Sequence, residues 1–339
     1  MRYKHTPGGA ANSSQIKGRP VAKQQPGHML VSIDFEMAWG LVHRNGASTY
    51  DIEDERRWLG QLLDVFDQHH VPATWATVGH LLLDACSTES GVKHPDVGRP
   101  DYSWFEGDWF AADPCGDVAT EPRWYAPDVV ADILRRTAGH ELGSHSFSHL
   151  IVGDEACTAE HFRSELVACS SAADRFGETM KSFVYPRNTI GHVEELISAG
   201  YSNYRGRRDD PFTGLGAMAK PARLLDKVLP SSRSVVHPRW EEGIWNLPAT
   251  CMFTIEGRKH PRSWLAQVKR RMHHAARQGG LFHVWFHPHN LVLGGEQSIE
   301  IFGELLAEAA KLRDRGQLET VTMADLAESL VPPNGRVDA

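Results

Sequence analysis

The chain alternates between short apolar runs and segments in which apolar residues recur at helical spacing. Runs such as 28–35 and 281–286 are short and apolar, which predicts buried strands. Segments such as 57–70 and 159–176 carry apolar residues three or four positions apart, which predicts amphipathic helices. The pattern as a whole predicts strands at 28–35, 72–79, 141–144, 182–185, 281–286 and 318–322, and helices at 57–70, 127–137, 159–176, 192–199, 263–277 and 299–315.

Strands that alternate with helices favour an α/β fold with a parallel sheet and right-handed crossovers. The length of 339 residues leaves room for two domains, but residues 28–330 contain no linker-like segment. We therefore expect one barrel-like domain over 28–330. Residues 1–27 are basic and polar and are expected to form a disordered tail, as are residues 331–339.

The segment 86–123 is too long for a plain loop and is rich in aromatic residues. Two interpretations stay open at this point. The rings of this segment could line a sugar-binding groove by stacking, or they could form a small core of their own. The aromatic residues concerned are Tyr102, Trp104, Phe105, Trp109 and Phe110.

Composition excludes several classes of protein. The formal net charge is −7, which argues against a general nucleic-acid binder. No apolar run is long enough to span a membrane, and the polar N-terminal segment does not resemble a secretory signal, so we expect a cytoplasmic protein. The five cysteines are widely spaced and form no Cys-x-x-Cys pair, which predicts neither a disulfide framework nor a cysteine zinc site.

Two acidic residues, Asp34 and Glu36, stand two positions apart at the end of the first expected strand. This spacing places both carboxylates on one face. In a parallel α/β barrel the C-terminal ends of the strands form the active face, so the pair is a candidate for acid–base chemistry or metal binding. The alternative is two exposed acids at a strand end.

Two histidines, His145 and His149, follow the expected strand at 141–144. At this spacing they would share one side of a helical turn, close enough to hold one metal ion. Two imidazoles and one carboxylate would give zinc three protein ligands and leave a position open for water. Surface or helix-capping histidines are the alternative.

Two further residues follow expected strands. Arg187 comes after the strand at 182–185, and a guanidinium there could hold a neighbouring carboxylate ionised. His287 directly follows the strand at 281–286 and has a side chain suited to general acid catalysis. A surface arginine is the alternative for the first. His283 and His289 are interpreted as a buried structural histidine and a loop histidine.

With these residues in place, the chain resembles the polysaccharide deacetylase family, the NodB homology domain of the carbohydrate esterases. Residues 139–149 are similar to its metal-binding motif, and residues 71–79 to its second strand. The resemblance implies a distorted (β/α)7 barrel, one divalent metal, commonly zinc, and removal of acetyl groups from sugars. By position it implies that His145 and His149 bind the metal, that Asp34 is the catalytic base, that Arg187 orients Asp34 and that His287 is the general acid.

The chain departs from the family pattern at one point. The family motif usually has two adjacent aspartates, the second on the metal, whereas Phe35 occupies that place here. Some relatives use an Asp-x-Asp spacing, in which case Glu36 would be the third metal ligand, so the division of roles between Asp34 and Glu36 stays open. Asp209 and Asp210 are candidate partners for His287.

These observations predict a metal-dependent hydrolase that removes an N-acetyl group from an amino sugar or a sugar-containing biosynthetic intermediate. Its expected partner is an N-acetylated carbohydrate and not a nucleic acid. Three alternatives remain: a hydrolase of a non-sugar C–N bond such as an amide or cyclic ureide, a carbohydrate-binding protein without catalysis, and a glycosidase that uses Asp34 and Glu36. The sequence does not indicate the oligomeric state.

Overall fold

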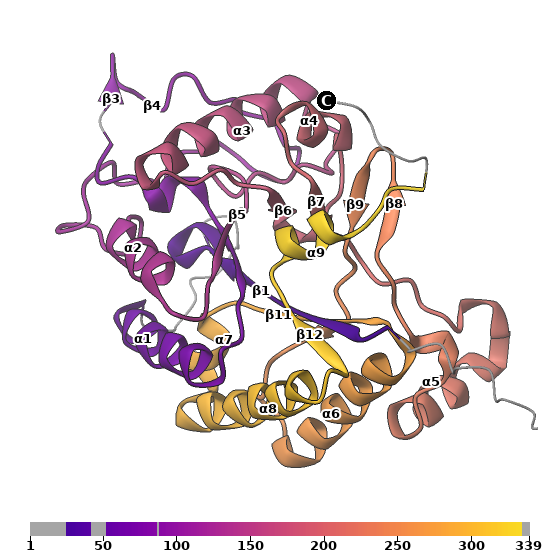
Figure 1. Cartoon of the computed structure of the whole chain (residues 1–339). Coiled ribbons are helices and arrows are strands. Elements are labelled where there is room, and N and C mark those ends of the chain that lie inside the picture. The colour runs from indigo at the N-terminus through magenta and orange to yellow at the C-terminus, as the bar shows by residue number, and fades with distance from the viewer. Residues whose placement is uncertain (1–24, 42–51, 87, 334–339) are drawn as a thin grey trace, which may run out of the picture.

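The computed structural model describes residues 25–41, 52–86 and 88–333, and its central feature is one curled sheet with helices around the outside (Figure 1). Neighbouring strands run parallel from one edge almost to the other, and the last strand is antiparallel. A curled, largely parallel sheet of this kind is a half-barrel, so the predicted α/β class with a distorted barrel in a single domain is confirmed. The order across the sheet is β10 (Cys251–Met252), β11 (Leu281–Phe286), β1 (Gly27–Phe35), β2 (Thr74–Thr77), β5 (Glu141–Ser144), β6 (Ser182–Val184), β7 (Asn203–Arg205), β9 (Ile244–Asn246) and β8 (Arg239–Glu241), and β12 (Leu318–Thr320) pairs with the start of β1.

Several helices begin or end at residues that favour a helix terminus. A capping box at Thr158 opens α3, proline opens α2 and α6, and Gly279 ends α6 in the left-handed conformation. The helices of the described residues are α1 (Ile52–His69), α2 (Pro127–Arg135), α3 (Ala159–Ala173), α4 (Val193–Ser198), α5 (Ala219–Val228), α6 (Pro261–Gln278), α7 (His289–Gly294), α8 (Glu296–Asp314) and α9 (Met323–Ser329). Short 3₁₀ turns include η1 (Met37–Gly40), η2 (Gly79–Leu82) and η4 (Pro186–Asn188).

The predicted strands and helices lie close to their expected positions, but several other elements were missed. The strands β5 and β11 match the prediction residue for residue. Between 200 and 262, however, the structure contains β7 to β10 and α5, for which the sequence shows no clear apolar run or period. The sheet begins at Gly27, inside the predicted tail, and residues 1–24 and 334–339 of the predicted tails lie outside the described residues.

The aromatic segment 86–123 packs against the barrel. Tyr102, Trp109 and Phe110 are buried, and the indole of Trp109 donates hydrogen bonds to Ser148. Trp104 stacks on Tyr102 with ring centroids 5.0 Å apart but is 41% exposed. The segment therefore joins the main hydrophobic core and does not form a separate one, and Trp104 is an aromatic ring on its outer side.

The C-terminal ends of β1, β5, β6, β7 and β11 lead into the segments that carry the candidate site residues. Because the strands are parallel, these ends meet at one rim of the half-barrel. Across the described part of the chain, no helix combines the length and apolar character that crossing a membrane requires.

Candidate metal and acid–base site

Asp34 is held by a buried ion pair. It is the penultimate residue of β1, and both of its carboxylate oxygens accept hydrogen bonds from Arg205, at 2.5 Å to Oδ1 and 2.7 Å to Oδ2. The Arg205 guanidinium also donates to the Ser32 hydroxyl at 3.0 Å and lies over the Trp285 ring at 4.5 Å. Burial by itself would raise the pKa of Asp34. The charge and hydrogen bonds of Arg205, together with the charges of His145 and His287, outweigh burial and hold that pKa below its ordinary value.

The guanidinium on Asp34 thus belongs to Arg205, whereas the sequence analysis gave that place to Arg187. Arg187 lies in η4 with a positive φ of 53°, and its guanidinium is 5.0 Å from the Trp104 ring. Its charge is one of the causes, after burial, that lower the pKa of His149. Arg205 escaped notice because it ends β7, a strand of three residues without a visible apolar pattern. The one sequence feature that could have indicated this strand end is the arginine directly after the aromatic Tyr204, at the start of the basic run 204–208.

Glu36, His145 and His149 form a buried cluster beside Asp34. Oε2 of Glu36 lies 3.0 Å from Nε2 of His149 and 3.5 Å from Nε2 of His145, and one ligand atom from each residue falls within 4.8 Å of the others. Burial by itself would raise the pKa of Glu36, but the nearby histidines lower it well below its ordinary value. The structure therefore brings together the three residues that the sequence analysis named as metal ligands.

The hydrogen bonds of His145 test whether a metal fits this cluster. Nδ1 of His145 lies 2.7 Å from the Val184 carbonyl oxygen, which assigns the ring proton to Nδ1. Nε2 then carries a lone pair that faces Glu36, and it has no hydrogen-bond partner among the described residues. A buried lone pair facing a carboxylate is unfavourable unless a proton or a metal cation lies between them. The donor set of two imidazoles and a carboxylate suits zinc.

The two histidines lie on an irregular loop, so the predicted helical turn is wrong. Ser146 and His149 have φ values of 60° and 61°, in the left-handed region, which interrupts helical hydrogen bonding. Glu165 of α3 accepts hydrogen bonds from the backbone N–H and the hydroxyl of Ser148 and so holds the loop in place. The imidazole rings of the two histidines nevertheless meet at a centroid distance of 5.1 Å.

His287 completes the group at the end of β11. Its Nε2 lies 3.7 Å from Asp34 Oδ2 and 3.6 Å from Glu36 Oε1. The side chain of His287 is 14% exposed, against 4% or less for the two carboxylates, so it is the member of this group nearest to solvent. This position suits a residue that passes a proton to a substrate.

The partner of His287 differs from the two predicted candidates. Asp209 pairs with Arg239, and Asp210 pairs with Arg223. Nδ1 of His287 instead lies 3.4 Å from Oδ1 of Asn290, and its ring stacks on His289 at 4.7 Å. Asn290 is close to His287 in the sequence, in the run His-Pro-His-Asn at 287–290. The turn that begins α7 brings the side-chain amide of Asn290 back to His287.

His283, interpreted above as structural, lies beneath this group. It is buried and contacts the Ser32 hydroxyl through Nε2 at 2.9 Å and the Leu247 carbonyl through Nδ1 at 3.0 Å. Burial, together with the nearby charge of Arg205, lowers the pKa of His283 to about 3. Because the hydroxyl of Ser32 also contacts Arg205, this neutral histidine supports the base of the Asp34 ion pair.

Comparisons with known proteins agree with this arrangement. Residues 44–201 match the family model described as polysaccharide deacetylase. This range contains both histidines of the cluster, and it ends before Arg205 and His287. No curated protein matches the chain.

Solved structures with a similar fold extend over nearly the whole chain. A protein from Mycobacterium smegmatis assigned to the polysaccharide deacetylases superposes with a TM-score of 0.59 at 15% identity, covering 94% of this chain and 96% of its own. The allantoinase PuuE superposes with a TM-score of 0.53 at 12% identity, with 89% of each chain covered. The 4-α-glucanotransferase of Thermococcus litoralis also has a TM-score of 0.53 at 12% identity, but only 41% of that chain is covered. At these identities the likeness is one of fold.

Proposed function

We propose that this chain is a metal-dependent hydrolase that removes an N-acetyl group from an amino sugar or a sugar-containing intermediate. The match of residues 44–201 to the polysaccharide deacetylase model supports this proposal. The observation that carries the proposal is the buried cluster of Glu36, His145 and His149 directly beside an ionised Asp34. A metal site, a base and an acid within one rim are the groups that amide hydrolysis requires.

Glu36, His145 and His149 would hold the divalent metal, which we propose to be zinc. When bound, such an ion polarises an acyl carbonyl and makes water more acidic. The division of roles follows from the ion pair. Asp34 has both oxygens on Arg205, whereas Glu36 turns Oε2 toward the two imidazoles, so Glu36 is the ligand and Asp34 the base.

The remaining steps use side chains of the chain itself. Asp34, kept ionised by Arg205, takes a proton from the water that attacks the acyl carbon. His287, nearest to solvent, donates a proton to the nitrogen of the leaving amine as the C–N bond breaks. Acid–base groups of this kind typically contribute about 10²- to 10⁴-fold each to the rate.

The test measures metal content and acetate release from a panel of N-acetylamino sugars. We expect about one equivalent of metal that depends on His145, and turnover of at least one sugar. Asp34→Asn should lower kcat by about 10²-fold or more while the metal stays bound. An Asp34→Asn variant that turns over at the wild-type rate would show that Asp34 is not the base.

The alternative substrate class is a non-sugar C–N bond, as in an amide or a cyclic ureide. It shares the same metal and acid–base groups, so the substrate panel decides between the two classes. Turnover of ring amides with inert N-acetyl sugars would favour the alternative. The cytoplasmic location stays a prediction, which fractionation of cells would test.

A further inference from the structure

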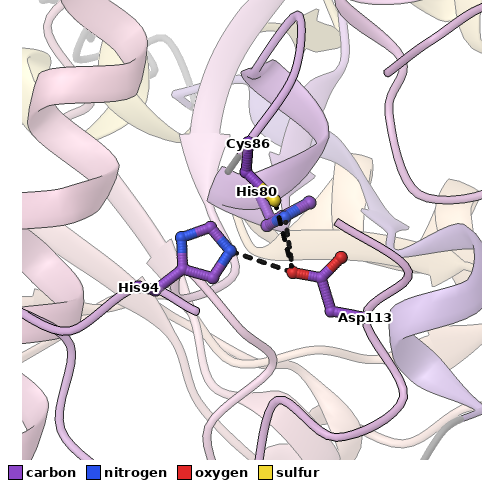
Figure 2. Close-up of side chains that lie close together, drawn as sticks. All are labelled: His80, Cys86, His94 and Asp113. Atoms are coloured by element: carbon purple, nitrogen blue, oxygen red, sulfur yellow. Dashed lines mark hydrogen bonds and ion pairs between the residues drawn. The ribbon is translucent and has the colours of Figure 1, made fainter. Parts of the chain in front are cut away.

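A second group of metal-ligating side chains lies outside the catalytic cluster. His80, Cys86, His94 and Asp113 converge so that one ligand atom from each lies within 4.8 Å of the others (Figure 2). His80 belongs to η2, shortly after β2, and the other three residues belong to the aromatic segment 86–123. The sequence spacing gave no indication of such a site, because the single cysteine is not part of a Cys-x-x-Cys motif.

The geometry of this cluster centres on one carboxylate oxygen. Oδ2 of Asp113 lies 2.9 Å from Nε2 of His94, 3.2 Å from Nε2 of His80 and 3.7 Å from Sγ of Cys86. The other oxygen, Oδ1, accepts a hydrogen bond from the backbone N–H of Cys115 at 2.8 Å. The carboxylate is thereby fixed by the backbone on one side and turned toward three ligand atoms on the other, as outer-shell partners orient metal ligands.

The histidine at the base of the cluster points a lone pair into it. Nδ1 of His80 lies 3.1 Å from the Trp124 carbonyl oxygen, so the ring proton is assigned to Nδ1. Nε2 of His80 then faces the Asp113 carboxylate as an acceptor, is fully buried and makes no hydrogen bond within the described residues. Two acceptors this close need either a proton or a metal cation between them, and the two further ligand atoms around the Asp113 carboxylate favour a metal. This is the same arrangement that His145 shows toward Glu36.

From this geometry we propose that His80, Cys86, His94 and Asp113 bind a structural zinc ion. Four protein ligands close the coordination shell of zinc, which distinguishes structural sites from catalytic ones. Two neutral imidazoles, a carboxylate and a thiolate also balance the charge of a divalent ion, with the thiol proton released to solvent. A groove of about 740 Å³, lined in part by Cys86 and His94, gives the ion a path of entry.

The position of the site explains what the ion would do. It would join η2 to the hairpin of β3 (Thr88–Glu89) and β4 (Val92–Lys93) and to Asp113, and so add to the backbone hydrogen bond that already joins Cys86 to Gly116. The backbone N–H of His80 donates to the Phe147 carbonyl at 3.0 Å, and the Phe147 ring packs against His80 and His94. The ion would therefore also brace the loop that carries the catalytic histidines.

A neighbouring thiol offers a competing state. Sγ of Cys115 lies 2.7 Å from Sγ of Cys86, and the Tyr125 hydroxyl lies 3.0 Å from the same sulfur. Oxidation of the two thiols to a disulfide by a cellular thiol oxidant would remove two electrons and two protons and take Cys86 away from the metal. A zinc site and this disulfide thus exclude each other, so the oxidation state of Cys86 and Cys115 tests the proposal.

The experiment loads the full chain with Co²⁺ under reducing conditions and records its absorption spectrum and metal content. A cobalt ion bound to a thiolate gives an intense ligand-to-metal charge-transfer band, and the Glu36, His145 and His149 site contains no sulfur. We expect about two equivalents of metal and the thiolate band in the wild-type chain. Cys86→Ser should lose the band and one equivalent, whereas the control Cys251→Ser should keep both.

Failure of this proposal is distinguishable from failure of the proposed function. His145→Ala should lose one equivalent but keep the thiolate band, since it changes only the catalytic cluster. A wild-type spectrum without the thiolate band would overturn the structural zinc site. This outcome is measured on the wild-type chain, so it does not depend on whether a variant folds. A Cys86–Cys115 disulfide in protein alkylated at cell lysis would overturn it as well.

Discussion

Replacing Arg205 by methionine tests whether Asp34 owes its ionisation to this one guanidinium. Both side chains are buried, at 0% and 4% exposure, and the pair is bidentate. Removing one partner of a buried ion pair typically costs about 3–5 kcal/mol, because the other charge is left without compensation. Protonation of Asp34 relieves that cost, so the pKa of Asp34 should rise in the variant.

The assay is the pH dependence of kcat/KM for release of the acyl group, since its acid limb reports the base of the free enzyme. Without the guanidinium, burial raises the pKa of Asp34, so the acid limb of the variant should move to higher pH. Arg205→Lys should fall between the wild type and Arg205→Met, because lysine keeps the charge but lacks the planar fork. Metal content and thermal unfolding of each variant are measured in parallel.

The matched control is Arg187→Met, at the arginine that the sequence analysis placed on Asp34. This variant should leave the acid limb where it is, because the Asp34 oxygens are bound to Arg205. The reasoning is refuted if Arg205→Met keeps the wild-type acid limb at full metal occupancy. It is equally refuted if Arg187→Met moves the limb and Arg205→Met does not.

Further predictions concern the loop that carries His145 and His149 and the outer rim of the site. Burial raises the pKa of Glu165 from 4.5 to about 7, so its contribution to the free energy of unfolding should fall by about 3 kcal/mol as the pH rises across that interval. Glu165→Gln should remove that slope in chemical denaturation measured between these pH values, and an unchanged slope would contradict it. Trp104→Ala should raise KM for a saccharide about two- to tenfold with little change in kcat, because an exposed ring beside Arg187 contributes about 0.5–1.5 kcal/mol by stacking. A changed kcat with constant KM would contradict that role.

The sequence predicted those parts of the fold that carry a strong period. Strands such as β11 and helices such as α3 are long enough for apolar spacing to identify them, and glycine or a capping box marks their ends. The site residues on these elements followed, because the C-terminal ends of parallel strands share a rim. Glu36, His145 and His149 meet there although the loop between the two histidines is irregular.

What escaped prediction depends on contacts between segments that have no period of their own. Arg205 belongs to a three-residue strand whose place in the sheet is set by pairing with β6 and β9. Asn290 reaches His287 through a short helical turn after β11. In both cases the partner is chosen by tertiary packing, and a sequence pattern can indicate only the residue type.

The two histidine-rich clusters share one design, and this has a thermodynamic consequence. His145 and His80 each donate Nδ1–H to a main-chain carbonyl and turn Nε2 toward a buried carboxylate. Because the folded chain orders these acceptors before any cation binds, metal should stabilise the folded state at each cluster by mass action. Titration of the metal-free chain should therefore raise the unfolding temperature in the wild type, less in His145→Ala and less in Cys86→Ser. An unfolding temperature that does not change with metal in any of the three chains would contradict the shared design, because the buried lone pairs that face carboxylates would then not bind a metal ion.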